Sequence, residues 1–184
     1  MAVDTSHQLN QTTKMKLIDY YQDQFKEYFQ QFVTPSLQGQ GAGGGVMGLK
    51  AYYCDLTETV IAASRSEQEF GYPLLHLELP QVRFEEKSEL LMVICDTTGV
   101  VLVNPTEDTP AAKNAALKTS RQIWDSIFST LKRESVYKDM LLEFSLNGVK
   151  GEVVLPTFAD RTIGYEFRFS VTFFGSGHVE EDED

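Results

Sequence analysis

The chain has 184 residues, of which 42% are hydrophobic and 11% aromatic, so it is long enough for one ordinary domain with a real core. Its longest apolar runs fall far short of the roughly 20 residues that a membrane helix needs. The formal net charge of −11 disfavours specific binding to a phosphate backbone, although a surface that DNA must pass without sticking would carry the same sign.

The first predicted element is a helix over Lys14–Val33, after a polar and flexible stretch of 13 residues. The chain lacks the basic-then-apolar start of a signal peptide, so we expect it to stay in the cytoplasm where it is made. Thr13 is the predicted N-cap, and Pro35 stops the helix. Apolar side chains recur every three or four residues: Leu17, Ile18, Tyr21, Phe25, Tyr28, Phe29 and Phe32.

A glycine-rich loop is predicted over Ser36–Gly48, with Gly43, Gly44 and Gly45 at its centre. A phosphate-cradling loop would need a lysine and a hydroxyl at fixed places after these glycines, and neither is present. The composition therefore predicts a flexible connector.

Several short strands are predicted next. Leu49–Ala63 is a strand region with a polar centre, followed by a polar turn, and Pro73–Leu79 alternates like a half-buried strand. Leu90–Cys95 and Val100–Val103 form either a hairpin or one long strand with a bulge near Gly99. We favour the hairpin.

The clearest predicted element is an amphipathic helix over Pro110–Glu134. Thr109 supplies a hydroxyl cap, and proline suits the first helical position. One face carries Ala116, Leu117, Ser120, Ile123, Trp124, Ile127, Phe128 and Leu131. The basic residues Lys113, Lys118, Arg121 and Lys132 lie mostly on the other face.

The last predicted elements are β-strands. Met140–Leu146 alternates into Asn147-Gly148, the preferred two-residue hairpin turn, and Glu152–Leu155 is its predicted partner. Tyr165–Phe173 closes the sheet, with apolar residues at every odd position and polar residues at every even one.

This order of elements predicts an α+β fold, in which a mixed or antiparallel sheet is packed by an N-terminal helix and a central amphipathic helix. We expect residues 14–175 to form a single domain. Residues 176–184 form a predicted flexible acidic tail, because the last five are all Glu or Asp.

No motif points to catalysis, a cofactor or a metal, and we expect a protein that is not an enzyme. His76 lies beside Glu78 on the polar side of a strand, where two possible ligands do not make a metal site and we expect a surface ion pair. Cys54 and Cys95 are predicted to be buried free thiols, with a disulfide left open.

The segment Tyr72–Phe174 resembles the tail-terminator and tail-completion proteins of long-tailed bacteriophages. The likeness rests on Tyr72–Glu78 as an early strand, on the helix around Gln122–Ile127, and on the glycine-then-aromatic closing strand Ile163–Val171. It covers a little over half of the chain, and the glycine-rich loop and acidic tail have no counterpart in it.

The resemblance implies a small α+β subunit that assembles with copies of itself into a ring, usually a hexamer, on the end of the tail tube. Such a ring stops polymerisation of the tube protein and offers a surface to the head-side connector, or neck, protein. DNA would pass through a negative lumen without specific binding, and the protein would be made in the host cytoplasm and reside in the virion, with no membrane contact.

Two other classes remain open. An acidic regulatory or inhibitor protein would bind its partner by charge mimicry, and an enzyme of unknown type is the weakest of the three readings. For contacts in a ring, we predict exposed loops at Gly43–Gly45, at Glu85 and Glu86, and at Asn147 and Gly148.

Overall fold

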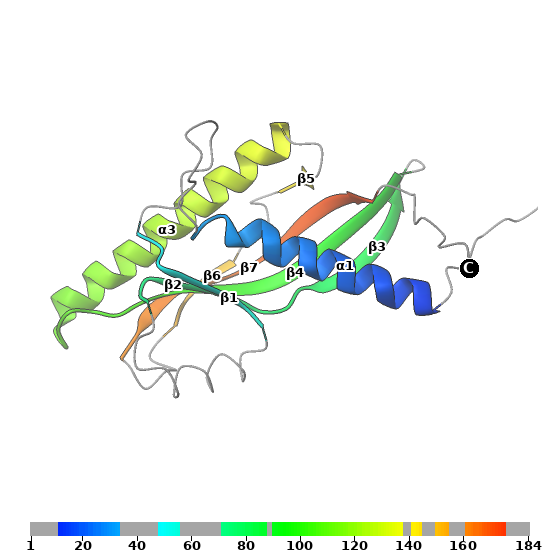
Figure 1. The fold of residues 1–184 in the computed structure, drawn as a ribbon. Helices are drawn as coiled ribbons and strands as arrows, with labels where there is room; N and C mark the ends of the chain where they lie inside the picture. Colours follow the sequence, from blue (N-terminus) through cyan, green and yellow to red (C-terminus); the bar gives the residue numbers. More distant parts are fainter. Residues whose placement is uncertain are drawn as a thin grey trace, which may run out of the picture.

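The computed structural model describes residues 11–33, 48–55, 71–87, 90–137, 141–144, 150–154 and 161–175. In this part of the chain, two helices cover one face of a seven-stranded sheet (Figure 1). The sheet is mixed, because one strand pair is parallel and the others are antiparallel. The predicted α+β fold is confirmed. Residues 1–10 of the predicted flexible N-terminus, the centre of the glycine-rich loop and the acidic tail lie outside the described residues, whereas residues 11–13 are helical.

The centre of the sheet is a long antiparallel ribbon of β4 (Leu90–Val103) and β7 (Ile163–Gly175). Their register runs without a break from Leu91 opposite Gly175 to Val103 opposite Ile163. The favoured hairpin around residues 96–99 is therefore wrong. The alternative of one long strand is confirmed, but without the bulge near Gly99.

The polar centre of β4 continues as strand because its groups find partners there. The Thr97 hydroxyl donates to the Glu78 carbonyl at 2.7 Å, and the Glu78 amide donates to the Thr98 carbonyl at 2.8 Å. Buried polar groups that are hydrogen-bonded in this way do not need a turn to reach water.

On one side of the ribbon, two strands lie end to end against β4. β2 (Leu74–Leu77) pairs with its second half and β3 (Gln81–Lys87) with its first half, while β1 (Ala51–Cys54) runs parallel beside β2. The strand predicted around residues 73–79 is confirmed. All four residues of β2 are buried, however, because the strand lies between two others and is covered on both faces.

On the other side, β6 (Lys150–Val154) pairs with the first half of β7, and β5 (Leu141–Glu143) pairs near its end. The predicted hairpin between these two segments is wrong: both run antiparallel to β7, and thus in the same direction. Asn147 and Gly148 fall between them, outside the described residues. Pairing with the long alternating strand β7 outweighs the local turn preference, because β7 pairs with both β5 and β6.

The helices α1 (Gln11–Gln30) and α3 (Pro110–Tyr137) bury the same face of the sheet (Figure 1). α1 begins before Thr13, so the predicted N-cap is wrong. The Thr109 cap is confirmed, since its Oγ accepts the Ala112 amide at 3.2 Å. The helices meet where the Tyr28 hydroxyl donates to the Glu134 carboxylate at 2.5 Å.

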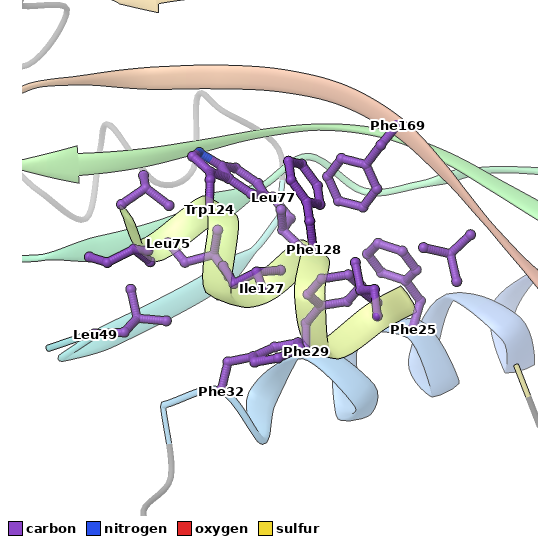
Figure 2. Packing of buried hydrophobic residues seen from close by; sticks show 14 of the residues in the cluster. Phe25, Phe29, Phe32, Leu49, Leu75, Leu77, Trp124, Ile127, Phe128 and Phe169 are labelled. Atoms are coloured by element: carbon purple, nitrogen blue, oxygen red, sulfur yellow. The ribbon is translucent and has the colours of Figure 1, made fainter. Parts of the chain in front are cut away.

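Aromatic side chains fill the space between the helices and the sheet (Figure 2). Trp124 and Phe128 of α3 stack with ring centroids 5.0 Å apart, and Phe29 of α1 lies 5.9 Å from Phe169 of β7. The predicted apolar faces of both helices are the ones that pack here. Each large side chain buried in this way stabilises the fold by about 1.5–3 kcal/mol.

Polar contacts from two side chains of α3 join this helix to the ribbon of β4 and β7. The buried Ser120 hydroxyl donates to the Val101 carbonyl at 2.8 Å and accepts the Tyr165 amide at 2.9 Å, so it bridges residues that lie opposite each other on β4 and β7. Trp124 Nε1 donates to the Tyr165 carbonyl at 2.9 Å. These bonds fix the position of α3 on the sheet.

Candidate interaction surfaces

The outer strands of the sheet have backbone groups that no neighbouring described strand covers. Among the described strands, β6 and β5 pair on one side only, as do β1 and β3 at the opposite margin. An unpaired strand edge offers a row of amide and carbonyl groups to another chain.

β6 is the more exposed of these edges. Its first four residues are exposed to solvent, and Val153 is 46% exposed, an uncommon state for a large apolar side chain in the described part of this protein. The other such residues, Met15 and Tyr20, belong to α1. Lys150 and Glu152 place charged side chains on this edge, which opposes non-specific pairing with other strands.

β6 and β1 are level with each other across the sheet. One row of paired residues runs from Val154 to Ala51, and another runs from Gly151 to Cys54. The strand directions also match: β6 runs with β4, whereas β1 runs against it. A copy of the chain rotated about an axis along the strands would therefore bring its β1 beside β6 in antiparallel orientation.

The predicted contact residues are not brought together. Glu85 and Glu86 were expected in a turn, but they lie within β3, opposite Met92 and Leu91, and point to opposite faces of the sheet. Both are exposed. Gly43, Gly44, Gly45, Asn147 and Gly148 lie outside the described residues.

The face of the sheet opposite the helices carries a polar cluster that the sequence did not reveal. Arg83 Nε donates to Asp96 at 2.8 Å, and Arg83 also forms an ion pair with Glu85. Ser170 of β7 donates to the same Asp96 carboxylate. The polar positions at two-residue spacing on each strand could have identified these residues, but only the register shows that they meet.

The cluster holds Asp96 in its charged form. Partial burial alone would raise its pKa, but the hydrogen bonds from Ser170 and Arg83 and the charge of Arg83 lower the pKa below the ordinary value. The same hydrogen bond with Asp96 raises the pKa of Arg83. All these groups are partly exposed, so they act as a polar surface patch and contribute little to stability.

His76 is buried, so the predicted surface position is wrong. The ring is 3% exposed, and its Nε2 lies 3.3 Å from the Asp55 carbonyl oxygen. Burial lowers the pKa of His76, which keeps the ring neutral at pH 7. It packs on the face opposite the helices, next to the small apolar cluster of Leu74, Val100 and Leu102.

Cys54 and Cys95 are free thiols, but only Cys95 is buried as predicted, since Cys54 is partly exposed. Burial raises the pKa of Cys95 to about 12 and also raises the pKa of Cys54, so neither is an activated nucleophile. Within the described residues, no group of three or more His, Cys, Asp or Glu side chains is arranged to hold a metal ion. Neither described helix is long and apolar enough to cross a membrane.

Comparison with known proteins adds no family assignment, since the sequence matches neither a protein-family model nor any of the curated proteins searched.

Proposed function

We propose that this chain is a structural, non-enzymatic subunit of a bacteriophage or phage-like virion, which forms a ring at the end of the tail tube. The ring stops polymerisation of the tube protein and joins the tail to the head-side connector. The observation that supports this most is the pair of level, oppositely placed strand edges, β6 and β1.

These edges suit a head-to-tail contact between copies. Because β6 and the neighbour's β1 would meet in antiparallel orientation, the sheet continues from one subunit to the next. A repeated contact between two different surfaces gives a closed ring when the rotation between subunits divides a full turn. The charge of −11 suits a passage through which DNA slides, because a negative wall repels the phosphate backbone.

The test combines light scattering behind a sizing column with negative-stain imaging, with and without purified tail tubes. We expect closed rings, alone or on tube ends. Val153→Lys should abolish them, because a lysine on the exposed edge opposes strand pairing. Met15→Lys is the matched control, since Met15 is 64% exposed on α1, away from both edges, and its replacement should leave the rings intact.

Both variants should keep the thermal midpoint of the wild type within about 2 °C, because both sites are exposed. Rings that persist in Val153→Lys would refute the edge contact. A wild-type protein that stays monomeric and does not bind tail tubes would refute the proposed ring. If that monomer instead competed with DNA for a protein partner in a salt-dependent way, the charge-mimic reading would replace ours.

A further inference from the structure

Strand pairing at the centre of the sheet fixes which backbone groups of each strand point to which side. Along an antiparallel strand, successive residues direct their amide and carbonyl groups to alternate neighbours. The Glu78 amide donates to the Thr98 carbonyl at 2.8 Å, so Thr98 of β4 faces β2. The next residue, Gly99, therefore faces β7, where Phe167 lies opposite it. Phe167 in turn faces β4.

Two residues of β6 direct their backbone groups away from the sheet. Glu166 precedes Phe167 on β7, so it faces the other way, toward Glu152 of β6. Because Glu152 faces β7, the residues on either side of it, Gly151 and Val153, direct their amide and carbonyl groups outward.

Two residues of β1 also direct their backbone groups outward. The Asp55 amide donates to the Leu77 carbonyl at 3.2 Å, so Asp55 faces β2. This bond agrees with the register, in which Cys54 lies opposite Leu77. Cys54 and Tyr52 therefore face away from β2. Both edges thus offer two outward residues at a spacing of two.

We propose that β6 pairs with β1 of the next copy in one register, in which Val153 lies opposite Tyr52 and Gly151 lies opposite Cys54. This register deepens the proposed ring and depends on it. Gly151 and Cys54 already lie in one row of paired residues across the sheet, so the row continues level from copy to copy. Each of the two pairs would exchange two backbone hydrogen bonds.

The side chains of the two edges also match in this register. Tyr52 packs against the core beneath the helices, and Val153 lies opposite Tyr165, which packs against the same core. Tyr52 of the next copy would cover Val153, which is 46% exposed. A shift by one residue would turn every side chain of the added strand to the wrong face of the sheet, which excludes such a register.

Charge selects one register among those that remain. Lys150 would lie opposite Asp55 of the next copy, and such a pair of opposite charges across two strands is attractive. Lys150 is exposed and forms no ion pair with a described residue. A shift by two residues in one direction would set Glu152 opposite Asp55, which is repulsive. The same shift in the other direction would set Lys150 opposite Tyr53 and remove the attraction.

Disulfide formation between copies tests the register. In a chain that carries both Lys150→Cys and Asp55→Cys, the two Cα atoms of neighbouring copies would lie about 4.5 Å apart, within the range that a disulfide bridges. Three strands separate β6 from β1 in one chain, a distance of about 19 Å, so the bond can form only between copies.

The matched control carries Glu152→Cys and Asp55→Cys. In the proposed register its cysteines would be diagonal neighbours with Cα atoms about 7–8 Å apart, beyond the reach of an unstrained disulfide. Under mild oxidation, Lys150→Cys with Asp55→Cys should form linked copies at least tenfold faster than the control. The native thiols are the same in both variants, so they do not account for the difference.

The outcomes separate the register from the ring. Light scattering before oxidation shows whether each variant forms oligomers. Oligomers in which the control links as fast as the test pair, or faster, would overturn the register and leave the ring in place. Wild-type protein that stays monomeric with and without tail tubes would overturn both.

A charge exchange provides a second readout that needs no cysteine. Lys150→Glu and Asp55→Lys should each raise the concentration at which half of the chains are assembled by about fivefold or more, because like charges then face each other. The two substitutions together should restore that concentration to within about twofold of the wild type. Circular dichroism checks that each variant is folded. Single variants that assemble normally, or a double variant that is not restored, would contradict the proposed pairing.

Discussion

Ser120→Ala provides the sharpest test of how α3 is held on the sheet. The Ser120 hydroxyl is fully buried and bonds both the Val101 carbonyl and the Tyr165 amide. Alanine keeps the helix and nearly the same volume, but it removes the partner of both backbone groups at a place that water does not reach. An unpaired buried polar group costs about 1–3 kcal/mol, so we expect a loss of about 2–4 kcal/mol in the free energy of unfolding.

The assay is urea unfolding followed by circular dichroism and tryptophan fluorescence, in which the midpoint should fall while the slope stays constant. Ser126→Ala is the matched control. This serine lies on the solvent side of the same helix, and among the described residues its hydroxyl bonds only the Gln122 carbonyl one turn earlier, at 3.0 Å. Its replacement should change the free energy of unfolding by no more than about 0.5 kcal/mol.

If Ser120→Ala cost no more than the control, the reasoning would be refuted, because the strand groups would then have other partners. A change in slope would show instead that the variant had altered the unfolded or native ensemble.

Four other substitutions test packing and buried titratable groups. Gly99→Ala should cost about 1–3 kcal/mol, because the new Cβ would lie 2.3 Å from Leu77 Cδ2. Gly71→Ala, whose Cβ would meet its nearest atom at 3.3 Å, should cost less in the same urea assay, and equal costs would contradict the packing argument. Burial raises the pKa of Tyr28 above its ordinary value of 10.0, so the contribution of Tyr28 to the free energy of unfolding is complete below pH 10 and falls as the pH rises. Unfolding measured at about pH 9 and 11 should then show a smaller alkaline loss of stability in Tyr28→Phe than in the wild type. Burial lowers the pKa of His76 below 6.5. The contribution of the neutral ring to the free energy of unfolding is therefore complete above that pH and is lost as the pH falls. His76→Gln should therefore lose less stability than the wild type between about pH 7.5 and 5.5, and parallel curves would show that the ring titrates normally.

The amphipathic elements were predictable because their pattern is local. The buried face of α3 follows from apolar residues at three- and four-residue spacing, and the alternation of Tyr165–Phe173 identifies a strand with one buried face. The cap at Thr109 is local as well, since it involves an amide only three residues away.

Strand pairing was not predictable in the same way. Asn147-Gly148 favours a tight hairpin, yet β5 and β6 both pair with β7, a partner that comes later in the chain. The polar run in β4 suggested a turn, but the register with β7 and the bonds of Thr97 keep it in one strand. Turn propensity measures a small local preference, which pairing along a long ribbon outweighs.

The candidate surfaces depended on tertiary structure to an even greater degree. Composition alone established an acidic chain, and helical spacing alone placed the basic residues of α3 on the side away from its apolar face. The burial of His76, the meeting of Arg83 with Ser170, and the level positions of β6 and β1 all depend on contacts between distant segments. The sequence by itself thus determined which face of each element is apolar, because that depends on the period of its residues. Only the fold decided which polar groups and strand edges remain for a partner, because that depends on what every other element covers.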